Sequence, residues 1–376
     1  MIPIDPEPQK TLCESETYLT RQLITYLGNK RALLDFIGQG LRAVQHKLGK
    51  EKLSIFDVFS GSGIVARYCK QYAERLLVND LEKYSAVINR CYLSNQDEID
   101  RGELEKTYCR LIAEAADKPL RWGLVAELYA PKDAARILPR ERVFYTPRNA
   151  IYIDTMRQLI EELPDSEKPY FIAPLLSEAS IHANTSGVFK GFYKNRETGT
   201  GQFGGKNQDS LSRIKGDINL PFPVFSNFNA EVAVYNENAN DLIEKLSEVD
   251  VAYLDPPYNQ HPYGANYFML NLIVDYTHPR HISSVSGIPA DWNRSDYNKP
   301  GKTYTALREL VSRIRAKYIL ISFNSEGFIT FEEMKNMLQR IGKLEILETS
   351  YNTFRGSRNL RNREIHLKEY LYLLEK

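Results

Sequence analysis

Short apolar runs alternate with amphipathic stretches in two separate parts of the chain. In the first part, about residues 18–122, one stretch has apolar residues at helical spacing, and the apolar run after it has the length of a buried strand. The pattern predicts, in order, a helix over 31–48, a strand over 53–59, a glycine turn over 61–63, a helix over 64–72 and a short second strand over 76–78.

The second part, about residues 231–376, repeats this alternation. Strands are predicted over 231–235, 249–254 and 318–323, with helices over 307–315 and 331–341. Two last apolar segments, 344–351 and 366–374, have the pattern of an antiparallel pair that closes a sheet. Because strands separated by helices favour parallel pairing, we expect an α/β fold with a mostly parallel sheet and helices on both faces.

The middle of the chain has no repeating strand–helix pattern. It is punctuated by prolines and contains helical pieces over 151–162 and 172–181. We interpret it as a mainly helical inserted subdomain. The predicted organisation is therefore a first half over 1–125, the insert over 126–230 and a second half over 231–376.

Composition narrows the class of protein without naming a function. The chain has 376 residues, of which 43% are hydrophobic, so it can bury a large core. With 49 basic and 48 acidic residues, any nucleic-acid-binding charge must be concentrated locally. The four cysteines form no CxxC pair, so neither a metal site nor a disulfide framework is expected. The N-terminal segment lacks the apolar core of a signal peptide, and no run is long enough to span a bilayer, so we expect a cytoplasmic location.

The first candidate site is the segment Asp57–Gly63, which follows a predicted strand and precedes a predicted helix. Glycines there allow a tight turn and close approach of a ligand, and free N–H groups at the helix start favour an anionic group. Asp80 comes nineteen positions after Gly61, at about the spacing that places an acid on a ribose. The set fits NAD, FAD or S-adenosylmethionine, and a plain glycine turn with a surface acid is the alternative.

The second candidate site is the tetrapeptide Asp255-Pro256-Pro257-Tyr258, which follows an apolar strand. The prolines fix the backbone and supply no N–H, so the Asp255 carboxylate and the Pro256 carbonyl can act as two fixed acceptors. Two such acceptors suit an exocyclic NH2 group, and Tyr258 offers a ring on which a base can stack. The alternative, a rigid loop that merely closes the strand, explains less of the tetrapeptide.

These motifs resemble those of the adenine-N6 DNA methyltransferases with Dam-like motif order. The resemblance extends to an N-terminal motif, to a later strand motif and to an arginine-rich C-terminal segment similar to that of the methyltransferases paired with FokI-type restriction enzymes. The matching segments are Tyr26–Lys30, Asp57–Gly63, Asp80, Phe144–Pro147, Asn184–Val188, Asp255–Tyr258, Ile321–Gly327 and Tyr351–Arg363. They exclude about 195–224 and 278–302.

The resemblance implies a Rossmann-like methyltransferase fold and S-adenosylmethionine as cofactor. Tyr26 and Lys30 would line the cofactor site, with Lys30 facing the methionine carboxylate; the family position of Tyr26 is often tryptophan. The segment from Asp57 would surround the methionine part through Phe59, Gly61 and Gly63. Asp80 would bind the ribose hydroxyls, and Asp255 would lie between the cofactor and the target amine.

The insert and the C-terminal segment are the expected contacts with double-stranded DNA. Base contacts would come from the insert, and phosphate contacts from the C-terminal arginines. The candidate residues are Lys190, Lys194 and Arg196 in the insert and Arg355, Arg358 and Arg361 near the C-terminus. The alternative for both sets is a solvated charged surface.

Two other functions stay open beside a site-specific DNA methyltransferase of a restriction-modification system. An RNA adenine-N6 methyltransferase would use the same core chemistry. An inactive methyltransferase-fold subunit that only binds DNA is disfavoured, because it need not keep Lys30, Asp80 and the whole tetrapeptide. A cognate restriction endonuclease is a possible partner, and neither a metal nor a membrane is expected.

Overall fold

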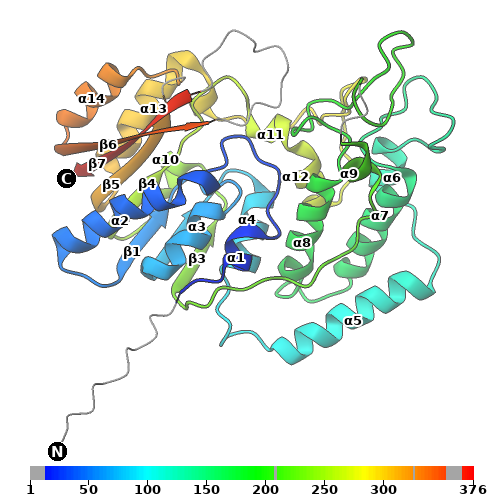
Figure 1. Cartoon of the computed structure of the whole chain (residues 1–376), viewed down its shortest axis with the longest axis horizontal. Helices are drawn as coiled ribbons and strands as arrows, with labels where there is room; N and C mark the ends of the chain where they lie inside the picture. Colours follow the sequence, from blue (N-terminus) through cyan, green and yellow to red (C-terminus); the bar gives the residue numbers. More distant parts are fainter. Residues whose placement is uncertain (1–12, 207–209, 325–326, 353–365) are drawn as a thin grey trace, which may run out of the picture.

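The computed structural model describes residues 13–206, 210–324, 327–352 and 366–376, and its centre is one seven-stranded sheet (Figure 1). The strand order is β3-β2-β1-β4-β5-β7-β6. The strands are β1 (Leu53–Asp57), β2 (Ala73–Asn79), β3 (Glu231–Tyr235), β4 (Val249–Leu254), β5 (Ala316–Asn324), β6 (Lys343–Asn352) and β7 (His366–Glu375).

The pairing confirms the predicted α/β class. The first five strands of the order pair in parallel, and β7 lies antiparallel between β5 and β6. Most strand predictions agree with the structure to within two residues, but β2 extends over seven residues instead of three. The prediction missed its first half because Glu74 and Arg75 interrupt the apolar run where the strand reaches the surface.

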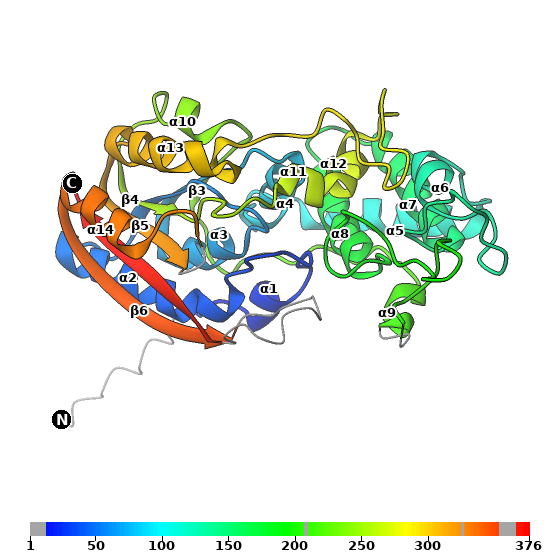
Figure 2. The same ribbon diagram turned by 90° about the horizontal axis from the view of Figure 1, so that it is seen from above.

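Helices cover both faces of the sheet (Figure 2). One face packs against α2 and α3, with Leu41 and Val44 of α2 fully buried. The other face packs against α10, α13 and α14. The bounds of these helices are η1 (Arg31–Leu33), α2 (Leu34–Leu48), α3 (Ile64–Cys69), η2 (Lys70–Tyr72), α10 (Ala239–Leu242), η3 (Asp296–Asn298), α13 (Pro300–Arg313) and α14 (Phe331–Gln339).

A second, helical region lies beside the sheet, on the right in Figure 1. Its helix starts follow from local chemistry: Thr146 caps α7 through the N–H of Asn149, with Pro147 at the first helical position, where its missing N–H costs nothing. The remaining helices are α1 (Glu16–Thr20), α4 (Lys83–Tyr92), α5 (Arg101–Asp117), α6 (Leu124–Tyr129), α7 (Pro147–Glu161), α8 (Lys168–Ile181), α9 (Leu211–Lys215), α11 (Tyr263–Asn266) and α12 (Phe268–Asp275).

The apolar core of the helical region is not confined to the insert predicted over 126–230. It also contains side chains of α4 and α5 from the first half of the chain and of α12 from the second half. The helical region is therefore joined to both halves through shared packing, and the exact subdomain boundaries stay a prediction. No helix among the described residues is long and apolar enough to cross a membrane.

Candidate active site

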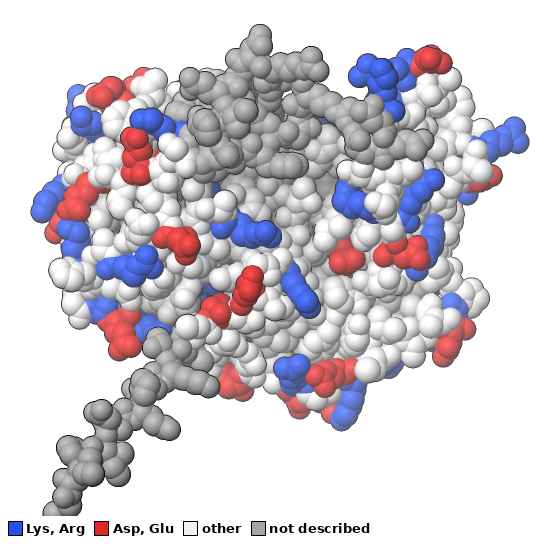
Figure 3. Space-filling view, in the orientation of Figure 1, with Lys and Arg blue, Asp and Glu red and all other residues white. Residues whose placement is uncertain are grey.

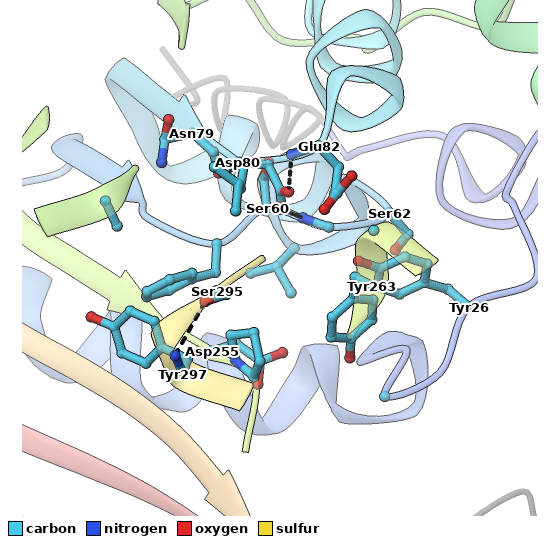
Figure 4. A pocket seen from close by; sticks show the side chains of 18 of the residues that line it. Tyr26, Ser60, Ser62, Asn79, Asp80, Glu82, Asp255, Tyr263, Ser295 and Tyr297 are labelled. Carbon is cyan, nitrogen blue, oxygen red and sulfur yellow. Dashed lines mark hydrogen bonds between the residues drawn. The ribbon is translucent and has the colours of Figure 1, made fainter. Parts of the chain in front are cut away.

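A pocket of about 890 Å³, its open mouth included, lies at the carboxyl ends of β1, β2 and β4 (Figure 4). This is the place where the strand order changes direction and where open α/β sheets bind ligands. Seven residues predicted from the sequence line it: Tyr26, Lys30, Phe59, Gly61, Asp80, Asp255 and Pro257. The structure thus brings together segments that lie more than two hundred positions apart in the chain.

The glycine turn after β1 is held in place by Asp80. The Gly61 N–H donates to Asp80 Oδ2 at 2.8 Å, and the Glu82 N–H donates to Asp80 Oδ1 at 2.9 Å. Gly61 has a φ of +51°, and a Cβ at this position would lie 2.9 Å from the ring of Tyr26. Only glycine therefore lets the turn and that ring form the same wall. Burial raises the pKa of Asp80 to about 6.

Two predicted cofactor residues lie beneath the pocket rather than in its wall. Gly63, with a φ of +77°, immediately precedes α3, and a Cβ there would lie 2.8 Å from Asn89 Oδ1. Asp57 is fully buried, and among the described residues no side chain forms a hydrogen bond with its carboxylate. Burial, with the nearby charges of Asp255 and Asp80, raises the pKa of Asp57 well above its usual value.

Asp255 shares a buried lysine with a second carboxylate. Lys30 Nζ lies 3.1 Å from Asp255 Oδ1 and 3.1 Å from Glu369 Oε1. The side chains of Lys30 and Glu369 are 4% and 0% exposed, whereas that of Asp255 is 18% exposed and opens into the pocket. Burial raises the pKa of Asp255 to about 6, Lys30 opposes the rise, and Glu369 adds to it. Lys30 is therefore bound to the acid of the tetrapeptide, and its contact with a methionine carboxylate stays a prediction.

The other members of the tetrapeptide have different positions. Pro257 lines the pocket, and Pro256 is buried behind it. Tyr258 lies beside the lining, with its ring edge-on to Phe323 at 6.1 Å and Lys30 Nζ at 5.9 Å from its ring centre. The ring of Tyr258 is thus held next to Asp255, and the stacking of a base on it stays a prediction.

Aromatic rings form two sides of the pocket. On one side Tyr26 stacks on Tyr263 at 5.0 Å and on Tyr267 at 4.8 Å. On the other side Phe59 meets Tyr297 edge-on at 5.0 Å. Figure 4 shows Asp255 between Tyr297 and Tyr263 in this view, with Asp80 and Ser60 across the pocket. The site can therefore hold a flat, partly cationic ligand between rings and carboxylates.

The comparison with protein families shows to which family the chain belongs. The D12 class of N6 adenine-specific DNA methyltransferases matches residues 26–337, which is most of the chain. The chain belongs to this family. The match spans the glycine turn, Asp80 and Asp255–Tyr258, and it confirms the resemblance stated from the sequence.

Individual relatives are similar over nearly the whole chain. The type II methyltransferase M.NlaIII of Neisseria lactamica is 30% identical over 94% of this chain and 99% of its own length. The type II methyltransferase M.FokI of Planomicrobium okeanokoites is 26% identical over 93% of this chain. The modification methylase StsI of Streptococcus sanguinis is 27% identical over the same share. This D12 chain spans about half the length of the last two.

Several pocket residues of this D12 methyltransferase were missed by sequence reasoning. Glu82 is buried, and its Oε2 accepts from Asn271 Nδ2 at 2.6 Å and from Asn293 Nδ2 at 3.2 Å. Its position two residues after Asp80 was an available signal. Others are Glu237 and Asn238 after β3, Tyr263 and Gly264 of α11, and Asn293, Ser295, Tyr297 and Asn298 of the segment 278–302, where no motif was recognised.

The predicted DNA-contacting residues of the insert lie together on its surface. Lys190, Lys194 and Arg196 are exposed, and the last two belong to a short hairpin in which Lys194 bridges to Gly201. Buried Asn184 holds this hairpin, because its amide donates to Val143 O and Gln202 O at 2.7 and 2.8 Å. Arg355, Arg358 and Arg361 lie outside the described residues.

Charge is interspersed over the face of the D12 chain seen in Figure 3, where lysines and arginines alternate with acidic residues. This agrees with the near-zero net charge of the sequence. Among the described residues, no group of three or more His, Cys, Asp or Glu side chains could hold a metal ion.

Proposed function

We propose that this chain transfers a methyl group from S-adenosylmethionine to N6 of an adenine that is extruded from a specific site in double-stranded DNA. The observation that carries the proposal is the position of Asp255 and Pro257 in one wall of a pocket whose other walls are the Gly61 turn and Asp80. A methyl donor bound beside the turn and an amine held by Asp255 would meet in one cavity.

The residues of the pocket fit S-adenosylmethionine. This cofactor carries a sulfonium, an α-ammonium and a carboxylate, so it is a cation overall. The lining supplies the carboxylates of Asp80, Glu82, Glu237 and Asp255, and the buried Asp57 lies near two of them, Asp80 and Asp255. Phe59 and Tyr297 offer ring surfaces to the adenine part. The ribose contact of Asp80 would use acceptor capacity that its two backbone hydrogen bonds leave free.

The chain's own part in the reaction is to make the target nitrogen nucleophilic. When bound, S-adenosylmethionine supplies an electrophilic methyl group on sulfur. The N6 lone pair of adenine is delocalised into the ring, and acceptors on both N6 hydrogens favour a tetrahedral, nucleophilic nitrogen. Asp255 and the Pro256 carbonyl are those acceptors, and the negative Asp255 stabilises the positive charge that develops on nitrogen. The amine becomes acidic only after methylation, so Asp255 need not remove a proton first.

The target base must leave the duplex to reach this site, because N6 is paired with thymine inside it. Tyr258, fixed edge-on by Phe323, would stack on the extruded adenine and offset part of the cost, by about 1–3 kcal/mol. The exposed hairpin with Lys194 and Arg196 would contact the DNA that flanks the base.

A role as the modification enzyme of a restriction-modification system is supported by relatives that are type II methyltransferases and modification methylases. A cognate endonuclease would then be a partner in function. The family favours duplex DNA over the alternative of an RNA substrate, and the complete site disfavours an inactive binding subunit. The cytoplasmic location and the division at 126–230 remain predictions.

The test is to express the chain in a host without DNA methylation and to map N6-methyladenine along the genome. We expect methylation at one short recurring sequence, and none with Asp255→Ala. The purified Asp80→Ala variant should bind S-adenosylmethionine more weakly in calorimetry, because its contact is made in both the ground and the transition state. Methylated structured RNA with unmethylated DNA would instead support the alternative.

A further inference from the structure

We propose that Glu369 is a positioning residue for methyl transfer, acting on Asp255 through Lys30; this inference rests on the proposed function. Glu369 lies in β7, in register with Asn324 of β5, and no sequence motif pointed to it. Its Oε1 lies 3.1 Å from Lys30 Nζ and accepts from the Ser322 hydroxyl at 2.6 Å. A carboxylate from the closing strand thus reaches the lysine that binds the acid of the tetrapeptide.

The geometry makes Lys30 a bridge. Its ammonium group lies within ion-pair distance of two carboxylates, those of Asp255 and Glu369. The side chain of Asp255 still opens into the pocket, where it can meet the target amine. With Glu369 fixed by Ser322 and the sheet, Lys30 cannot swing away, and the plane of the Asp255 carboxylate is set from behind the pocket.

Glu369 also changes the net charge beside the target nitrogen. Lys30 alone would neutralise Asp255 and weaken it as a hydrogen-bond acceptor. Because Glu369 shares the same ammonium, the three groups carry a net charge of −1 beside the nitrogen that becomes positive. A completely buried carboxylate is costly, and one of its oxygens, Oε2, has no partner among the described groups. A purely structural position would be filled more cheaply by a neutral residue.

The pKa of Asp255 gives a measurement that should not change if Glu369 has only a structural role. The titratable groups that face Asp255 are Lys30 before η1, Asp57 in β1, Tyr253 in β4, Tyr258 after β4, Tyr263 in α11 and Glu369 in β7. Of these, the negative charge of Glu369 raises the pKa of Asp255. Its removal should therefore let Asp255 ionise at a lower pH.

The experiment uses Glu369→Gln in the full-length protein. Glutamine can still accept from Ser322 and Lys30, so the change isolates the charge. The single-turnover rate on target DNA should fall on the order of 10–100-fold, as for other preorganised electrostatic groups. The acid limb of the pH–rate profile should move to lower pH, while calorimetric affinity for S-adenosylmethionine stays within about threefold of wild type. Glu348→Gln, at an exposed position of β6, is the matched control and should change none of these.

The possible results distinguish the role of Glu369 from the proposed function of the chain. A rate near that of wild type with an unmoved acid limb overturns the role of Glu369. If Glu369→Gln does not fold, Ser322→Ala decides, because it removes only the hydroxyl that orients Glu369 and should slow methyl transfer on the order of tenfold. An equally fast Ser322→Ala then overturns the proposal. A wild-type protein that methylates no adenine at all contradicts the proposed function instead.

Discussion

Asp255 combines partial burial with an open path to the pocket. Its side chain is 18% exposed, enough for a substrate amine to reach it and little enough for burial to raise its pKa to about 6. Sequence reasoning found Asp255 because the tetrapeptide is local. It could not find Glu369, because nothing near position 369 indicates that β7 brings this residue to Lys30.

Asp255 must be ionised to act as the acceptor, so methyl transfer should depend on pH. With a pKa of about 6, the ionised fraction is nearly complete at pH 8 and falls tenfold per unit well below pH 6. We expect the single-turnover rate with saturating cofactor and DNA to fall along an acid limb centred near pH 6. A rate that stays constant down to pH 5 would contradict this role of Asp255.

At the scale of elements, local patterns predicted the sheet well and the connecting loops poorly. The strand β4 was predicted with its observed bounds because every residue of it is buried. The helix predicted from Leu307 begins instead at Pro300, where proline at the first position starts it before the apolar pattern does. The segment 278–302 shows no periodicity, yet it supplies Asn293 and Tyr297 to the pocket.

This segment is joined to the cofactor half through Glu82, which gives a prediction about stability. Burial raises the pKa of Glu82 to about 7, and the Asn271 and Asn293 amides oppose the rise. A raised carboxyl pKa stabilises the fold below the unfolded value of 4.5, and that stability is lost as pH rises from there to about 7. Glu82→Gln keeps an acceptor for both amides and removes the buried charge.

The cofactor-free Glu82→Gln protein should therefore melt above wild type at pH 8.5, by about 1–4 °C. Near pH 5 the difference in melting temperature should be several-fold smaller, because Glu82 is then neutral in the folded protein and this pH is only just above its unfolded pKa. Thermal unfolding followed by circular dichroism at both pH values measures the difference. Glu231→Gln, at the exposed start of β3, is the control, and a gain of equal size at pH 5 would show that charge at Glu82 is not the cause.

At the scale of the whole molecule, long-range packing decides what the sequence left open. The apolar core of the helical region joins α4, α8 and α12, which are distant in the chain, so a linear division into three parts describes it incompletely. Because the net charge of the chain is only +1, we expected the basic residues that contact DNA to be concentrated locally. The exposed hairpin of the insert, which carries Lys194 and Arg196, is a candidate for such a concentration. Exposed side chains of an anchored hairpin are expected to reach base edges, whereas the C-terminal arginines are expected on phosphates.

These two basic sets should therefore have separable effects. Replacing Lys190, Lys194 and Arg196 with alanine should lower the preference for the cognate site over near-cognate sites, because base contacts carry sequence information.

Replacing Arg358 and Arg361 with alanine should weaken binding to every sequence about equally and flatten the salt dependence by about 0.9 for each phosphate that is no longer neutralised. Near-cognate methylation rates and salt slopes measure both. A triple alanine variant of α5, at Arg101, Lys106 and Arg110, controls for the loss of charge on a helix that lies apart from the sheet (Figure 1). If the C-terminal pair relaxes specificity while the three insert substitutions shift only affinity, the prediction that the insert recognises the bases is wrong.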